Sequence, residues 1–196
     1  TFDDGFKSNR KLAEEVLNEM NIKALFFIVS DFLGEKKESQ KYKSIINNIY
    51  PKGPTRFELS DPMDKKDIEF LLSTGHKIGC HTFSHKMLST INSRSELNKE
   101  LIKSKLNLER EFGIKVNHFA FPFGTFKSIN KNSLKILNQN FDFIHSGLRG
   151  NNKNSNNNKL VFRDAVNPEM EIIRLKSFLI GNADFLYIGK YNKLKK

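Results

Sequence analysis

The order in which apolar runs and amphipathic segments follow each other constrains the fold of this chain most. Apolar runs at 23–29, 76–81, 116–124 and 141–147 alternate with segments in which apolar residues recur at helical spacing. No hairpin-type turn joins two apolar runs, so we expect parallel strands connected by crossover helices. The alternation therefore predicts an α/β fold with a parallel sheet or barrel.

The segments between these runs carry helix boundary signals. We expect helices from about Ser8 to 21, around 42–50, from 64 to 75, from 95 to 113 and from 129 to 140. Asp64 is suited to cap the start of its helix, and Gly75 and Gly113 are suited to end theirs.

Beyond residue 147 the pattern is weaker. Six of the eight residues at 151–158 are Asn, which predicts an exposed loop. A short strand (159–165), a helix beginning at Pro168 (168–181), a last strand (184–189) and a basic tail are expected to follow. We expect one domain over 1–196, truncated at its N-terminus because Thr1-Phe2 reads as the tail of a strand.

Composition excludes several classes of protein. The formal charge is +11, but the lysines are scattered rather than clustered with aromatic residues, so we expect no nucleic-acid partner. No apolar stretch is long enough for a transmembrane segment. The single cysteine, Cys80, excludes an internal disulfide framework. Oligomeric state and location, whether bacterial cytoplasm or cell envelope, stay open.

Polar and ionisable residues follow the predicted strands at the point where each ends. Asp3-Asp4-Gly5 follows the first strand, and His81 and His85 follow the third. Later strands are followed by Pro122-Phe123-Gly124, by His145 and by Arg163-Asp164. Because parallel strands end at the same edge of a sheet, these groups are expected to converge on one site.

The spacing of His81 and His85 suits a metal ion. If the chain turns helically after the strand, residues four apart lie on one face and can share an ion. Two neutral imidazoles and one carboxylate of the Asp3-Asp4 pair would suit zinc or a similar divalent cation. The other carboxylate would then face the substrate. Taken singly, each motif is also compatible with a surface histidine pair or a solvated turn.

Other ionisable residues are expected to lie elsewhere. His76 and His118 stand at strand starts, and five residues of strand would place His76 about 16 Å from His81. Cys80 should face the opposite side of its strand from His81.

Three motifs together resemble a known family. "TFDDG", "GHKIGCHTFSH" and "FAFPFG" are similar, in this order, to the first three motifs of the polysaccharide deacetylases, also called the NodB-homology or carbohydrate esterase family 4 enzymes. The resemblance spans Thr1 to about Gly124. It implies a distorted (β/α)7-type barrel with parallel strands and outer helices, and hydrolysis of N-acetyl groups on an amino-sugar polysaccharide.

The resemblance also implies roles for individual residues. Asp4, His81 and His85 would hold one divalent metal ion, for which we expect zinc, and Asp3 would be the general base. The backbone N–H of Phe123, where the family has a Tyr, would stabilise the oxyanion.

The chain departs from the family pattern at two places. Ala120 stands where the family often has an Arg that braces the base; Arg163 is our candidate substitute, and an ordinary surface Arg is the alternative. The late family motif lacks its His, so we take His145 as the candidate general acid, the alternative being a neutral core histidine. Arg149 is a candidate for binding a substrate carboxylate or phosphate.

The roles of three phenylalanines and the identity of the substrate stay open. Phe83, Phe123 and Phe126 are candidates for stacking on a sugar or for local packing. Instead of a polysaccharide, the substrate could be a smaller lipid-linked or nucleotide sugar. The departures also admit a catalytically impaired glycan-binding domain.

Overall fold

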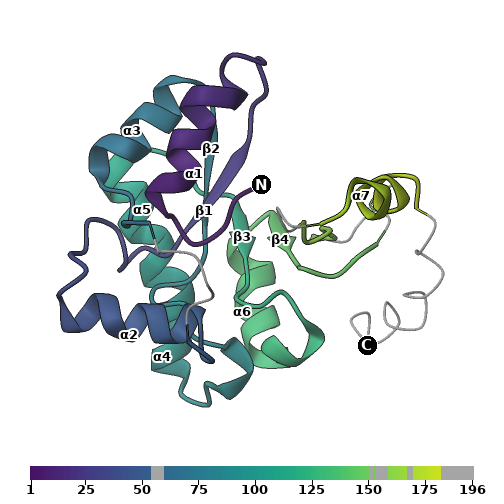
Figure 1. Cartoon of the computed structure of the whole chain (residues 1–196). Helices are drawn as coiled ribbons and strands as arrows, with labels where there is room; N and C mark the ends of the chain where they lie inside the picture. Colours follow the sequence, from purple (N-terminus) through teal and green to yellow (C-terminus); the bar gives the residue numbers. More distant parts are fainter. Residues whose placement is uncertain (54–59, 151, 153–158, 167–169, 182–196) are drawn as a thin grey trace.

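The computed structural model describes all residues except 54–59, 151, 153–158, 167–169 and 182–196 (Figure 1). The predicted last strand at 184–189 and the basic tail lie outside the described residues, as do most of the Asn-rich loop and Pro168.

The described strands form one parallel sheet in sequence order, β1-β2-β3-β4-β5. Their bounds are β1 Leu25–Ile28, β2 Lys77–Cys80, β3 His118–Ala120, β4 Phe143–His145 and β5 Leu160–Val161. Phe2 forms a parallel bridge to Phe26 of β1, which fits the prediction that Thr1-Phe2 is the tail of a strand. The prediction of a parallel α/β fold is confirmed, and each strand is shorter than its apolar run.

Helices connect the strands as crossovers. Their bounds are α1 Lys7–Leu12, α2 Gln40–Ile49, α3 Lys65–Ser73, α4 Arg94–Asn98, α5 Ser104–Phe112, α6 Lys131–Asn140 and α7 Ile172–Leu179. Two helices contain π-helical turns: η1 (Ala13–Leu17) continues α1, and η3 (Lys99–Lys103) joins α4 to α5. Short 3₁₀ turns occur at η2 (Leu88–Thr90) and η4 (Phe126–Ser128).

The residues predicted to start and end two of the helices do so in the structure. Asp64 accepts from the backbone N–H of Asp67, whose side chain accepts in return from Asp64, which makes a capping box at the start of α3. Gly113 ends α5 in the left-handed conformation that glycine adopts without strain.

The core lies between the sheet and its helices. Helices α3 and α5 pack on β2, and in Figure 1 they lie with α1 on one side of the strands, whereas α7 lies on the other side. Phe26, Ile78, Phe119 and Ile144 are buried in neighbouring strands. No helix in the described ranges is long and apolar enough to cross a membrane.

The sheet is curved so that its two edges approach each other. Phe2 lies beyond β1 and Arg163 beyond β5, at opposite ends of the strand order. The Arg163 side chain nevertheless contacts Thr1 and Asp3. This curvature, typical of a barrel, brings the first and last strand ends to one site.

Candidate metal centre and active site

Asp4, His81 and His85 converge at the carboxyl ends of the strands. The Nε2 atoms of His81 and His85 lie 3.4 and 3.3 Å from Oδ1 of Asp4. One ligand atom from each residue lies within 4.8 Å of the others. Both imidazoles are buried, at 2% and 4% exposure, so their orientation is fixed by packing.

The hydrogen bonds of the two histidines show that the site suits a cation. Nδ1 of His81 lies 2.7 Å from the carbonyl oxygen of Ala120, and Nδ1 of His85 lies 3.3 Å from that of Asn48. A carbonyl only accepts, so each Nδ1 carries a proton and donates it. A neutral imidazole then presents a bare Nε2 lone pair to the Asp4 carboxylate. Three electron-pair donors facing one point require a positive charge between them, so the residues fit a divalent metal ion.

The pKa shifts of Asp4 and His81 also indicate that a positive charge stabilises this site. Burial opposes the charged forms of Asp4 and His81, but the contact between them outweighs it. The pKa of Asp4 is held well below its ordinary value, and that of His81 is raised. Without a metal ion, a proton on an imidazole supplies the missing charge.

The loop between the two histidines is not the helical turn that the sequence suggested. Thr82 and His85 have positive φ angles, 69° and 60°, and residues 82–85 form no helix. The hydroxyl of Thr82 accepts from the backbone N–H of His85 at 2.9 Å and closes the turn. The spacing of four works because this turn folds the chain back, rather than because of helical periodicity.

The backbone conformation at Asp4 and Gly5 directs the side chains of Asp3 and Asp4 to different places. Asp4 has φ of 74° and Gly5 has φ of 89°. Positive φ at a non-glycine residue costs conformational energy and is often found at functional sites. The turn sends the Asp4 side chain to the histidines and leaves Asp3 beside Arg163.

Arg163 holds Asp3 through two hydrogen bonds. Its Nη1 and Nη2 donate to Oδ1 and Oδ2 of Asp3 at 2.7 and 2.9 Å, and its Nε donates to the carbonyl of Ser146. Its guanidinium lies 5.0 Å from the centre of the Phe27 ring. Burial raises the pKa of the Asp3 carboxyl, but His81 and Arg163 outweigh burial and lower it below the ordinary value. Asp3 is therefore ionised at neutral pH.

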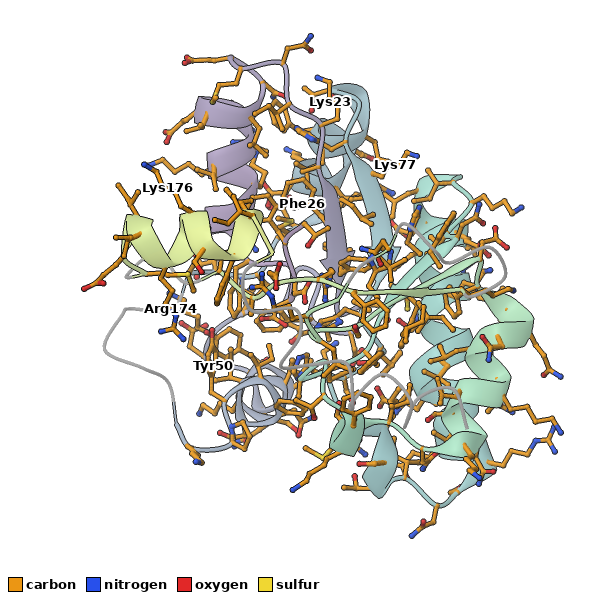
Figure 2. All side chains as sticks on the ribbon, turned by 90° about the vertical axis from the view of Figure 1, so that its right-hand side faces the viewer. Lys23, Phe26, Tyr50, Lys77, Arg174 and Lys176 are labelled. Carbon is orange, nitrogen blue, oxygen red and sulfur yellow. The ribbon has the colours of Figure 1, made fainter. Side chains whose placement is uncertain are left out.

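These groups border a cavity of about 420 Å³. Its lining includes Asp3, Asp4, His81 and His85, together with Tyr50, Phe123 and the segment 163–166. In Figure 2, Lys23 and Lys77, near the starts of β1 and β2, lie above Phe26, and Tyr50 lies below it. The cavity thus lies at the carboxyl ends of the strands, as expected for this fold class, and its volume is that of a small-molecule site.

Phe123 projects into this cavity from the loop after β3. It has φ of 63°, its ring lies 5.2 Å from that of His85, and 36% of the residue is exposed. Its backbone N–H has no hydrogen-bond partner among the described residues. A Cβ atom on Gly124 would lie 2.3 Å from the nitrogen of Gly147, so only glycine lets this loop pack against the end of β4. Phe83, in contrast, is buried, and Phe126 does not line the cavity.

His145 lies beneath the cavity rather than in its wall. Its ring is 6% exposed, 4.8 Å from the ring of Phe27, and its Nε2 lies 3.0 Å from Nδ1 of His118. Burial, Arg163 and His118 lower the pKa of His145 to about 3. A neutral ring without a place in the cavity wall fits the core alternative better than the general-acid role.

Arg149 is directed away from the cavity. It is 5% exposed, donates to the carbonyl of Phe178 in α7 at 2.6 Å, and lies 3.4 Å from Oδ1 of Asp164. Its guanidinium also stacks on the Phe178 ring at 4.5 Å. These contacts join α7 to the segment after β4, and Arg149 is not among the residues that line the cavity.

Sequence reasoning did not find two residues that complete the site. Asn48 supplies the carbonyl for His85, and its side chain donates to the carbonyl of Ser84 at 2.7 Å. Tyr50 contributes to the cavity wall from the end of α2. Asn48 lies in α2 and Tyr50 directly after it, in a segment without a recognisable motif, so only the packing of α2 reveals their place.

Comparison with known proteins agrees with this geometry. Residues 1–140 match the family model described as polysaccharide deacetylase. Over 147 residues the chain is 31% identical to a peptidoglycan-N-acetylglucosamine deacetylase of Bacillus cereus, a match covering 74% of this chain and 42% of that protein. The chain therefore spans less than half of the length of this curated relative.

Solved structures show the same fold. IcaB from Ammonifex degensii aligns with a TM-score of 0.65 and 21% identity, covering 91% of this chain and 68% of that one. The Streptococcus pyogenes deacetylase PplD, in complex with acetate, aligns with a TM-score of 0.67 and 18% identity, covering 90% and 67%. With the family match over most of its length, the chain belongs to the polysaccharide deacetylase family.

Proposed function

We propose that this chain is a metal-dependent hydrolase that removes N-acetyl groups from an amino-sugar-containing polysaccharide and releases acetate. The observation that carries the proposal is the convergence of Asp4, His81 and His85 beside an Arg163-bound Asp3, in one open cavity. The peptidoglycan-N-acetylglucosamine deacetylase among the relatives supports an N-acetylated glycan as substrate.

Asp4, His81 and His85 would hold the metal ion, with zinc as the candidate because of the two imidazole ligands. A bound divalent cation would polarise the acetamide carbonyl and lower the pKa of water. The carbonyls of Ala120 and Asn48 fix the tautomers of the histidines for this purpose.

Asp3 acts as the general base in this proposal. Its pKa is lowered, so it is ionised at neutral pH and takes a proton from the attacking water. Arg163 occupies both oxygens from one side and fixes the carboxylate plane. It thereby does for Asp3 what the family's Arg, replaced here by Ala120, is expected to do.

The remaining steps use the backbone of Phe123 and the proton held by Asp3. In this proposal the N–H of Phe123 donates to the oxyanion as the carbonyl carbon becomes tetrahedral. The leaving amine needs a proton, and Asp3 lies in the cavity and has just received one. We infer that Asp3 returns this proton, because His145 lies beneath the cavity and is neutral.

Acetate release from N-acetylated oligosaccharides, with zinc supplied, tests the proposed function. Asp3→Asn should abolish acetate release while zinc still binds, and Asp31→Asn, a partly exposed carboxylate paired with Lys41, should leave release unchanged. Full activity of Asp3→Asn would contradict the mechanism.

Oligosaccharide length separates the two substrate classes. A polysaccharide substrate predicts that kcat/KM rises with chain length. No rise would favour the smaller lipid-linked or nucleotide sugar, and binding without acetate release would favour a glycan-binding domain.

A further inference from the structure

Glu100 is a buried carboxylate that the proposed mechanism does not use. It lies in the π-helical turn η3, is 1% exposed, and accepts three hydrogen bonds. The donors are the backbone N–H of Phe83 at 3.1 Å, the backbone N–H of Ser84 at 2.9 Å and the Ser84 hydroxyl at 2.6 Å. All three belong to the loop between His81 and His85.

That loop needs contacts to keep its shape. Thr82 and His85 both have positive φ, which costs free energy unless the surroundings compensate. Phe83 and Ser84 stand between these two positions, so the three bonds to Glu100 act on the part of the chain that sets the direction of His85.

Further contacts hold the same loop through its carbonyl groups, including backbone N–H donors from Ser30 to Thr82 and from Asp31 to Phe83. The hydroxyl of Ser104 donates to the carbonyl of Thr82 at 2.7 Å and accepts from the thiol of Cys80. Burial raises the pKa of Cys80 to about 12, so the thiol keeps its proton for this bond. From α2, Asn48 donates to the carbonyl of Ser84. All of these contacts engage carbonyl groups of the loop, and Glu100 supplies the acceptors for the N–H groups of Phe83 and Ser84.

A carboxylate suits this position better than any neutral side chain. Ionised, it only accepts, and here two backbone N–H groups share one oxygen and a hydroxyl takes the other. In the described part of the chain Glu100 forms no ion pair, and Lys99 and Lys103 instead lie over the Phe83 ring at 4.6 and 5.4 Å. The charge of Glu100 is thus directed to the loop.

We propose that Glu100 is a positioning residue for the metal centre. By fixing the backbone at Phe83 and Ser84, it aims Nε2 of His85 at the point that His81 and Asp4 also face. The proposal rests on the proposed function in one respect, because it takes that point as the place of a divalent cation.

Zinc affinity of the folded protein tests this role. Glu100→Gln keeps the volume but removes the charge and one acceptor, so zinc should bind about tenfold more weakly. Glu109→Gln is the matched control, because Glu109 lies in α5, accepts the backbone N–H of Val116 and is not among the residues that line the cavity. It should bind zinc as the wild type does. Thermal unfolding with chelator present reports the loss of stability separately.

Amide hydrogen exchange of the metal-free protein gives a second readout. In Glu100→Gln the amides of Phe83 and Ser84 should exchange faster, while they keep wild-type rates in Glu109→Gln. Ser84→Ala removes the hydroxyl bond from the loop side, and its loss of zinc affinity should not add to that of Glu100→Gln.

The outcomes separate this inference from the proposed function. Zinc affinity of Glu100→Gln within twofold of the Glu109→Gln control, or unchanged exchange at Phe83 and Ser84, would overturn the role of Glu100. Failure of the wild type to bind zinc would contradict the metal site itself, and the exchange rates would then decide on Glu100 alone.

Discussion

Arg163 donates to both carboxylate oxygens of Asp3, although 160 positions separate the two residues in the sequence. The pair joins the end of β5 to the residue after Phe2, at the opposite edge of the sheet. One interaction thereby brings the sheet edges together and orients the proposed base.

Replacing Arg163 by Lys should lower kcat strongly. Lysine has one ammonium and cannot hold both oxygens in one plane, so the carboxylate loses its fixed orientation. We expect kcat to fall about 100-fold, within the range attributed to general-base catalysis, with a smaller effect on zinc affinity. Acetate release and zinc titration measure the two effects. Arg94→Lys, on an exposed position of α4, is the control, and equal activity of both variants would remove Arg163 from the mechanism.

Asp4→Asn and Asp3→Asn should differ in their affinity for zinc. Asp4 faces both imidazoles, so its amide variant should lose zinc affinity as well as activity, whereas Asp3→Asn loses activity alone. Isothermal titration with zinc distinguishes the two variants. Identical zinc affinities for both variants would contradict the separate roles.

His145→Gln should keep most of the acetate-release activity. The ring lies beneath the cavity, and glutamine can still bond to Nδ1 of His118. We expect kcat within about fivefold of the wild type, whereas loss of a general acid would cost roughly 100-fold or more. A loss of that size with zinc affinity unchanged would restore the general-acid role.

Stability should depend on pH through His145. Its pKa falls from 6.5 when unfolded to about 3 when folded, so the unfolded state binds the proton more readily. The stability contributed by the neutral ring is present above pH 6.5 and is lost as the pH falls towards 3. Between pH 7 and pH 5 this group alone should remove about 2 kcal/mol of unfolding free energy.

Urea unfolding at several pH values with chelator present measures this dependence. Between pH 7 and pH 5, the unfolding free energy of His145→Gln should fall by about 2 kcal/mol less than that of the wild type. Parallel curves would show that the ring is not held neutral in the folded protein.

Zinc should raise the melting temperature of the wild type. A ligand that binds only the folded state stabilises it by about 2.7 kcal/mol at a hundred times its Kd. Calorimetry with and without chelator should show the shift, and His85→Ala should lose it, whereas His76→Ala should keep it because His76 bonds to Asn18 and Ala24 at the other end of the sheet. A zinc shift that survives in His85→Ala would place the metal elsewhere.

The parallel sheet and the main site residues could be predicted from the sequence because local patterns encode them. Apolar runs mark β1 to β4, and parallel strands bring the residues after them to one edge. His81 and His85 were found by this logic, although the turn between them was expected to be helical. Positive φ at Thr82 is imposed by hydrogen bonds with distant residues, and local propensity does not report it.

The contributions of Asn48, Tyr50 and Glu100 could not be predicted, because they depend on how helices pack against the strand ends. Arg149 and His145 occupy suitable places in the sequence, yet the structure turns the first towards α7 and the second into the core. Sequence position shows which strand end a residue follows, and only packing shows where its side chain points.

Acetate release during titration of zinc into metal-free protein shows whether the reaction needs a metal ion held by Asp4. With an N-acetylated oligosaccharide as substrate, activity of the wild type should rise to saturation at one zinc ion per chain, and activity of Asp4→Asn should stay at background. Full activity of the chelated wild type, or equal activation of Asp4→Asn, would contradict this expectation.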